Sequence, residues 1–412
     1  MNVATDSYDW NKNTWSLIDS YFQDKSQLVK EQINSYNDFI NNWLPTFLQQ
    51  NRIVVSNNSR ELKFEIINCS ICKPARYVNR QGKRPLTPAD ARNNDYNYMA
   101  RLYVDFRITD TDNNRDTKVE EFIETKVCIG GIPAMVRSSV CHLNGRSPGE
   151  ASTLGECPFD LGGYFIIHGG ERAIIAQERP KENDIFVFSE ANASSSKDLI
   201  RAEIKSTIDQ RYFPVRLCSI RLSKELTLRV YVPYNRRPIP IGIIFKAFGA
   251  ITDKEIQECL IDIDDKSNED FVNIVANSIR ESSMVLTQED AIMAVANSIN
   301  ININPEDFSS TDVSDEIKTN FRKKYAKDML NRDFLAHVGN SPVKKLRFMS
   351  RMVRELLNAY RDPRLLTDRD SLLSKRLDLS GPLLSQIFRT QFLQLIRDIK
   401  HQFGRIMTNC TQ

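Results

Sequence analysis

The spacing of apolar residues predicts helices towards both ends of the chain and strands between them. Near the N-terminus, alternating steps of four and three residues predict an amphipathic helix that ends at Pro45. The apolar stripe of this helix consists of Val29, Ile33, Tyr36, Ile40 and Trp43. Strict alternation of apolar and polar residues predicts half-buried strands at 62–66 and 102–108.

The pattern then changes from strands to helices. Residues 162–188 and 226–232 are predicted to form strands, and 252–316 to form helices with polar connections. Two further helices are predicted from Met349, Met352, Val353, Leu356 and Tyr360, and from Leu384, Ile387, Phe388, Leu395, Ile396, Ile399 and Phe403. Because strands and helices are segregated rather than alternating, the predicted fold class is α+β.

The length of 412 residues is enough for two or three domains of roughly 150 residues each. The small, polar segment ANASSSKD (191–198) is a candidate domain boundary. A long basic connection with several prolines occupies 73–98. A connection of that length inside a domain is typical of a functional or a mobile loop.

The net charge of +3 hides an uneven distribution of charged residues. Residues 252–316 carry sixteen acids and three bases, whereas 322–354 carry ten bases and two acids. Residues 73–101 carry seven bases and two acids. Basic segments attract polyanions and acidic segments meet basic partners, although charges that balance one another on solvated faces give the same pattern.

An apolar fraction of 41% and a charged fraction of 26% are those of a soluble globular protein. No apolar run is long enough to span a membrane, and the N-terminus does not read as a secretory signal. The eight cysteines are scattered, as in a chain kept reduced. Only Cys69 and Cys72 form a CxxC pair, and no second pair follows to complete a zinc site, so we interpret them as small residues at a strand end.

The stretch GGYFIIHGGERAIIAQERP (162–180) has the glycines of a phosphate loop and a histidine that could be a general base. No Lys-Ser or Lys-Thr follows the glycine pair, and the flanks are β-branched rather than helical. We therefore predict a hairpin with glycines at its turn. His168 is interpreted as a turn residue, since the chain has no HExxH or GxSxG motif to accompany it.

The acidic run DIDD (262–265) could hold magnesium, but it lacks neighbouring groups that would position a phosphate. We interpret it as solvated surface. No set of residues makes a complete active site. The residues alone thus indicate an α+β protein with basic segments that face nucleic acid, and no catalysis of its own.

The stretch 162–180 closely resembles the motif GGYFIINGxEKVLIAQE of the second-largest subunit of multisubunit RNA polymerases, in their eukaryotic, archaeal and large-DNA-virus branch. Further segments resemble this family in the family's order. They are DSYDWNKNTWSLIDSYFQDKSQLVKEQINSYNDFI, RPLTPADARNNDYNYMARLYVDF, GGIPAMVRSSVCHLNG, IPIGIIFKAFGAITDKEI and DRDSLLSKRLDLSGPLLSQIFRTQF. These matches span nearly the whole chain.

The resemblance implies two mixed α+β domains, a lobe inserted into a protrusion. The first part of the protrusion would be 1–196, the lobe 197–374 and the return segment of the protrusion 375–412. The resemblance covers only the N-terminal third or so of such a subunit. The magnesium and zinc sites of the family would lie outside this chain, so no cofactor and no metal are expected in it.

The implied role is one wall of the DNA cleft, which holds duplex DNA and RNA–DNA hybrid by phosphate contacts. The candidate nucleic-acid-binding residues are Lys375, Arg376, Arg369, Arg211, Arg236 and Arg237. Ion pairs at the domain junction are the competing interpretation, because Asp368, Asp370 and Asp378 are adjacent. The chain departs from the family at Ser371–Ser374, where leucines replace a His-x-Gly turn.

The implied partners are the largest polymerase subunit, the rest of the polymerase and initiation factors. The expected location is the nucleus, or the cytoplasm or virion for a viral enzyme, and no membrane is involved. The alternative is a protein–protein interaction platform without direct DNA contact, with 252–316 as its working surface. An independent enzyme is the third hypothesis, and it lacks a complete site.

Overall fold

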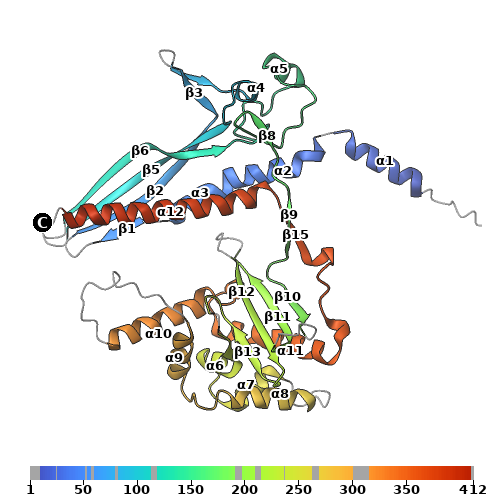
Figure 1. Ribbon diagram of the computed structural model, residues 1–412, viewed down its shortest axis with the longest axis vertical. Helices are drawn as coiled ribbons and strands as arrows, with labels where there is room; N and C mark the ends of the chain where they lie inside the picture. The colour runs from blue at the N-terminus through green and yellow to red at the C-terminus, as the bar shows by residue number, and fades with distance from the viewer. Residues whose placement is uncertain are drawn as a thin grey trace, which may run out of the picture. The chain divides into compact units, whose positions relative to one another are not determined.

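The computed structural model describes residues 10–24, 26–51, 53–56, 60–78, 82–112, 118–190, 197–208, 215–235, 237–261, 269–299 and 315–409. The chain folds as two compact units. Unit 1 consists of Met1–Arg179 and Leu377–Gln412, and unit 2 of Pro180–Arg376. Both units contain helices and antiparallel strands (Figure 1), so the predicted α+β class is confirmed.

Unit 1 is built on an antiparallel four-stranded sheet in the order β1-β2-β5-β6. These strands are Ile53–Ser56, Arg60–Cys72, Met99–Asp112 and Lys118–Pro133. Two small hairpins accompany the sheet, β3 (Ala75–Val78) with β4 (Gly82–Pro85) and β7 (Phe165–Ile167) with β8 (Gly170–Arg172). The helices of unit 1 are α1 (Trp10–Phe22), α2 (Gln27–Asp38), α3 (Leu44–Gln50), α4 (Pro88–Asn93), α5 (Pro148–Thr153) and α12 (Ser380–Asn409).

The long helix α12 joins the N-terminal helices although the two lie at opposite ends of the sequence (Figure 1). Its Phe388 ring lies within 6.4 Å of the rings of Phe39, Trp43 and Phe47. Phe392 adds a further edge-on contact to Phe47. This aromatic cluster buries large apolar surfaces and fixes α12 against α2 and α3.

The first turn of α12 approaches α2 so closely that only glycine is accommodated. The Gly381 N–H donates to Ser35 Oγ at 3.1 Å, and Ser380 Oγ donates to the Gln32 carbonyl oxygen at 3.1 Å. A Cβ atom at position 381 would collide with the Ser35 carbonyl oxygen. The Leu-Ser-Gly of the return segment is therefore a packing motif.

Unit 2 contains an antiparallel five-stranded sheet in the order β10-β11-β12-β13-β14. Its strands are Ile185–Ser189, Asp198–Ser206, Arg216–Ser223, Leu228–Tyr231 and Ile239–Pro240. The helices are α6 (Ile241–Ala247), α7 (Asp253–Leu260), α8 (Glu269–Arg280), α9 (Gln288–Ser298), α10 (Asp315–Arg332) and α11 (Pro342–Arg361), with short 3₁₀ turns at Ala336–Val338, Pro363–Leu365 and Leu372–Ser374.

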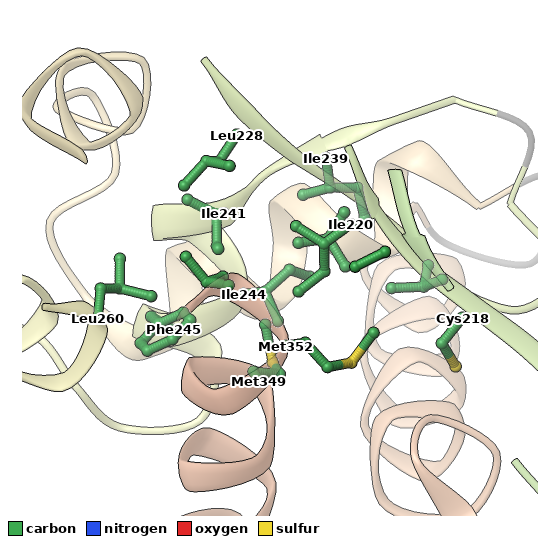
Figure 2. Packing of buried hydrophobic residues seen from close by; sticks show 14 of the residues in the cluster. Cys218, Ile220, Leu228, Ile239, Ile241, Ile244, Phe245, Leu260, Met349 and Met352 are labelled. Carbon is green, nitrogen blue, oxygen red and sulfur yellow. The ribbon is translucent and has the colours of Figure 1, made fainter. Parts of the chain in front are cut away.

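The core of unit 2 lies between the sheet and the helices α6 and α11. Figure 2 shows Ile220 and Ile239 of the sheet beside Ile244 of α6 and Met352 of α11. All four side chains are almost completely buried. The alternation of apolar residues on β12 and β13 thus supplies one face of this core.

A buried lysine closes one helix end in unit 2. Lys345 is fully buried, and its ammonium group donates to the carbonyl oxygens of Leu330, Asn331 and Phe334 at 2.7, 2.8 and 2.6 Å. These carbonyls lie at the C-terminal end of α10, where helix carbonyls lack partners within the helix. Burial lowers the pKa of Lys345 to about 8.

Two more cations cap helix ends in the same way. Lys246 is buried and donates to the carbonyl oxygens of Ser282 and Val285, just beyond α8, at 3.2 and 2.9 Å. Arg354 donates to the Cys259 carbonyl oxygen at the end of α7 at 3.1 Å. Two of the ten basic residues of 322–354, Lys345 and Arg354, therefore bind carbonyl oxygens of unit 2 itself.

Two strands carry the chain between the units. β9 (Gln177–Pro180) leads out of unit 1, β15 (Lys375–Asp378) leads back, and the two pair as a two-stranded sheet. The expected boundaries were 196/197 and 374/375, whereas the units divide after Arg179 and after Arg376. The first boundary differs because β10 and β11, on either side of 191–198, pair with each other within unit 2.

The sequence predicted that the N-terminal helix ends at Pro45. The structure contradicts this prediction. A π-helical turn at Phe39–Trp43 follows α2, and α3 continues to Gln50 with Pro45 in its first turn. The wider turn lets the helix pass the residue that cannot donate a backbone hydrogen bond. The predicted strands at 62–66 and 102–108 and the two C-terminal helices are confirmed. No helix in the described ranges is both long and apolar enough to cross a membrane.

We predict that Gly381→Ala destabilises unit 1 by about 1–3 kcal/mol, because the added methyl group must displace the backbone of α2. Thermal unfolding of the full chain measures this change. Gly404→Ala is the matched control on the same helix, since its Cβ meets nothing within 4 Å. The control is expected to be neutral or slightly stabilising. Equal effects of both substitutions would contradict the close approach.

We predict that Lys345→Met destabilises unit 2 by about 2–4 kcal/mol, because three carbonyl oxygens lose their donor in a buried position. Chemical denaturation of the full chain gives the free energy of unfolding. The neighbouring Lys344 is exposed, so Lys344→Met should stay within about 0.5 kcal/mol of the parent chain. A similarly small effect at Lys345 would show that the cap contributes nothing.

Candidate nucleic-acid interface

The hairpin predicted in the stretch 162–180 is confirmed. β7 and β8 pair with Phe165 opposite Arg172 and Ile167 opposite Gly170. The two turn residues, His168 and Gly169, both have positive φ angles, of 52° and 71°. Positive φ at both central residues is characteristic of the tight type I′ turn, in which glycine at the second position is strongly preferred.

The hairpin turn is fastened to the loop that follows α4. The His168 N–H donates to Asn97 Oδ1 at 2.7 Å, and the Gly169 N–H donates to the Tyr96 carbonyl oxygen at 3.2 Å. A Cβ at position 169 would lie within 2.5 Å of Asp95 Oδ1. The glycine therefore serves backbone packing, and the exposed His168 side chain is a turn residue.

Arg92 of α4 joins three parts of unit 1 through its guanidinium group. Its Nε donates to Glu171 on β8 at 2.7 Å, Nη1 donates to Glu156 at 2.9 Å and Nη2 donates to the Tyr164 hydroxyl at 2.6 Å. The Tyr164 hydroxyl in turn donates to Asp160 at 2.6 Å. Because Glu156 is buried, this network pairs a carboxylate that would otherwise be costly.

The Arg92 network explains why separate motifs of the sequence occur together. Arg92 lies in RPLTPADAR, and Glu171 and Tyr164 lie in the stretch 162–180. Sequence reasoning did not find this set, because its members come from segments with no common spacing. The sequence shows only an arginine and several acids in separate polar segments, and this does not identify the partners.

Three of the candidate nucleic-acid-binding residues, Arg369, Lys375 and Arg376, lie close together in sequence at the end of unit 2. Arg376 is exposed on β15 and donates one hydrogen bond to the Lys375 carbonyl oxygen at 2.8 Å. Lys375 is half-buried at the start of the strand. Arg369 is exposed, and its guanidinium carbon lies 4.4 Å from the centre of the Phe188 ring on β10. This stacking orients Arg369 and leaves its charge in place.

Two of the three carboxylates next to these residues, those of Asp378 and Asp368, have other partners. Asp378 is buried and pairs with Arg179 at 2.5 Å within unit 1. Asp368 accepts the backbone N–H of Asp370 at 2.9 Å. In the described ranges neither Arg369 nor Arg376 forms an ion pair.

The remaining candidates are Arg237, Arg211 and Arg236. Arg237 is exposed beside β14, with its backbone N–H bound to Asn235 Oδ1 at 3.0 Å. Arg211 and Arg236 lie outside the described residues, as does the acidic run 262–265. The leucines that replace the family's His-x-Gly turn, Leu372 and Leu373, form a short 3₁₀ turn and are 80% and 87% exposed.

Two other pairs of side chains suggest chemistry by their residue types. Ser206 Oγ and His337 Nδ1 are 2.8 Å apart, but Ser206 is completely buried and burial lowers the pKa of His337. Cys69 and Cys72 lie at the end of β2, as predicted, and burial raises the pKa of the Cys69 thiol. Across the described ranges, no group of three or more His, Cys, Asp or Glu side chains could hold a metal ion.

Comparison with known proteins identifies the class as a subunit of a multisubunit RNA polymerase. The chain is 30% identical to the DNA-directed RNA polymerase II subunit RPB2 of Eremothecium gossypii, over 94% of this chain and 33% of the relative. It is 30% identical to the DNA-directed RNA polymerase II subunit 2 of Arabidopsis thaliana, over 97% of this chain and 34% of the relative. It is 33% identical to the DNA-directed RNA polymerase subunit Rpo2N of Methanocaldococcus jannaschii, over 94% of this chain and 74% of the relative.

Residues 27–412 match the model of the family described as RNA polymerase beta subunit, and the chain belongs to that family. The family predicted from the sequence motifs is therefore confirmed. The chain corresponds to an N-terminal portion of the second-largest subunit, and it spans about a third of the length of the RPB2 relatives.

We predict that Arg92→Met destabilises unit 1 by about 3–5 kcal/mol, because it leaves the buried Glu156 carboxylate without its cation. Thermal unfolding of the full chain measures the loss. Arg172→Met is the matched control, since Arg172 is exposed on the same hairpin. In the double variant Arg92→Met with Glu156→Gln, part of the loss should be recovered. Additive losses in this cycle would contradict the pairing.

Proposed function

We propose that this chain forms one wall of the DNA cleft in a DNA-directed RNA polymerase, with unit 1 as the protrusion and unit 2 as the lobe. It acts with the largest subunit and the rest of the enzyme, and it offers docking surfaces to initiation factors. In this role the chain holds duplex DNA and RNA–DNA hybrid, and it does not catalyse nucleotide addition alone. The location is the nucleus for a cellular enzyme, and the cytoplasm or virion for a viral one.

The observation that carries this proposal is the state of Arg369 and Arg376, near the point where the chain leaves unit 2. Arg369 and Arg376 are exposed and have no carboxylate partner in the described ranges, while Asp378 is taken by Arg179. Phosphate contacts require such side chains, because backbone binding depends on cations on one face and not on base recognition. The competing interpretation is that these residues form ion pairs at the domain junction with Asp368, Asp370 or Asp378. It is less well supported, because neither Arg369 nor Arg376 is paired with a carboxylate in the described ranges.

The alternative of a purely protein-binding platform relied on the acidic residues of 252–316. In the described part of this region several acids have internal roles. Glu255 completes the capping box of α7, and Asp290 in the first turn of α9 accepts the Thr287 hydroxyl at 2.6 Å. Glu281 pairs with Arg229 at 2.9 Å. Fewer carboxylates are therefore available for a partner than the sequence count suggests, which favours the cleft wall.

We predict that the full chain binds duplex DNA weakly, without sequence preference and with strong salt dependence. Reversal of charge in Arg369→Glu and Arg376→Glu should each weaken binding and reduce the slope of log affinity against log salt by about 1. Fluorescence anisotropy with a labelled duplex, for the chain and for the assembled polymerase, measures both quantities.

Lys254→Glu is the matched control for net charge, since Lys254 is 83% exposed on the acidic helix α7. It should change the affinity for duplex DNA much less than reversal at Arg369 or Arg376. If all three variants behave alike, the effect is one of net charge and the proposed interface is wrong. Unchanged affinity in the assembled enzyme after reversal at Arg369 and Arg376 would favour the protein-binding platform.

A further inference from the structure

A cavity of about 640 Å³ lies in unit 1, and its lining includes no residue of the return segment 375–412. It is bounded by the hairpin β3–β4, by the loop after α4, and by the start of β5 and the end of β6. Its lining residues are Ala75, Arg76, Leu86, Tyr96, Asn97, Met99, Arg101, Cys128, Gly130 and Gly131. Volumes of about 300–1,000 Å³ are typical of sites for small ligands or for one unit of a polymer.

All charged side chains that line the cavity are arginines. Arg76 comes from β3 and Arg101 from β5, and both are exposed. Arg101 faces away from the core, because the next residue on the strand, Leu102, is buried on the opposite face of the sheet. No carboxylate is among the residues that line the cavity, so its charged lining side chains are both cations.

The hairpin β3–β4 places a third arginine next to this pair. Arg84 on β4 is the direct cross-strand partner of Arg76, so both side chains leave the same face of the hairpin. Like charges directly opposite each other destabilise a strand pair. In the described ranges no ion pair offsets this repulsion at Arg76 or Arg84. An anion between the two guanidinium groups would remove the cost.

An aromatic ring lies at the same place. The guanidinium carbon of Arg76 is 4.5 Å from the centre of the Tyr96 ring, and the Tyr96 side chain is half-buried in the cavity wall. Arginine over tyrosine presents a flat surface with donors at its rim. Single-stranded nucleic acid is bound by this combination of cations for the phosphates and flat groups for the bases.

We propose that this cavity binds single-stranded nucleic acid, with the phosphodiester group at Arg76 and Arg84 and an unpaired base beside Tyr96. The proposal rests on the proposed function, because a cleft wall meets single strands wherever the duplex opens. A base-paired helix offers only its outer phosphates to a recess of this size, whereas an unstacked nucleotide enters it. The site is distinct from the arginines of the return segment.

Binding of a labelled oligothymidylate to the full chain at low salt tests the site. We expect Arg76→Gln and Arg84→Gln each to weaken binding about three- to tenfold, and Tyr96→Leu about tenfold. Arg146→Gln is the matched control, since Arg146 is exposed in unit 1 and does not line the cavity. It should leave the affinity within about twofold of the parent chain. Circular dichroism checks that each variant is folded.

Photocrosslinking gives a second readout that does not depend on substitution at the cavity. Oligothymidylate carrying 4-thiothymidine should crosslink to the peptides that contain Tyr96, Met99 or Cys128. Crosslinks confined to other peptides would overturn the proposal. The proposal would also be overturned if polyglutamate competed as well as unlabelled oligothymidylate. The site would then bind any polyanion and would not recognise a base.

The two proposals fail separately. If the cavity variants bind oligothymidylate as the parent chain does, while Arg376→Glu still weakens duplex binding, only the single-strand site is wrong. If Arg376→Glu leaves duplex binding unchanged while the cavity variants lose oligothymidylate, the cleft-wall interface at the return segment is wrong and the cavity remains a single-strand site.

Discussion

The fold of unit 1 depends on one ion pair at the place where the chain leaves this unit and returns to it. Arg179, at the end of the first segment, pairs with Asp378, at the start of the second. Asp378 is buried and the Arg179 side chain is 33% exposed, so salt screens this pair less than it would a pair on the surface. Once the two segments are held together, α12 is directed onto α2 and α3, where Phe388 and Phe392 complete the aromatic cluster.

The need to hold distant segments of unit 1 together also explains several of the sequence motifs that resemble the family. Gly381 allows α12 to approach Ser35, Gly169 allows the hairpin turn to reach Asp95, and Arg92 gathers the acids of two motifs. None of these residues needs to contact a substrate. Some motifs, such as the glycine pair beside a histidine, suggest a catalytic or phosphate-binding site in the sequence. In this structure they allow distant segments to pack closely.

The periodicity of apolar residues predicted the elements that depend on local sequence. The alternation of residues 62–66 and 102–108 gave strands, and the stretch around His168 gave a hairpin, because side-chain spacing and turn preferences act over a few residues. It failed at Pro45, where a π-helical turn carries the helix past a proline, since tertiary packing against α12 outweighs the local signal.

Long-range partnerships could not be predicted from the sequence. The three carbonyls around Lys345, the partners of Arg92 and the stacking of Arg369 on Phe188 join residues without common spacing. Charge counts were misleading for the same reason, because Lys345 and Lys246 contribute to a basic or mixed segment but lie inside unit 2. The positive charge of residues 73–101 indicated an attraction for polyanions, but it did not predict the cavity at Arg76 and Arg101.

The insertion of unit 2 sets an order for folding during synthesis. Ser380 contacts Gln32 across 348 residues, whereas all residues of unit 2 lie between those two positions. A long loop adds little to the equilibrium cost of closure, because that cost grows only with the logarithm of length. In time, however, unit 2 is complete before α12 has been made. Phe39, Trp43 and Phe47 therefore lack their contacts with Phe388 until the end of synthesis. The N-terminal helices are among the last elements to acquire their full packing.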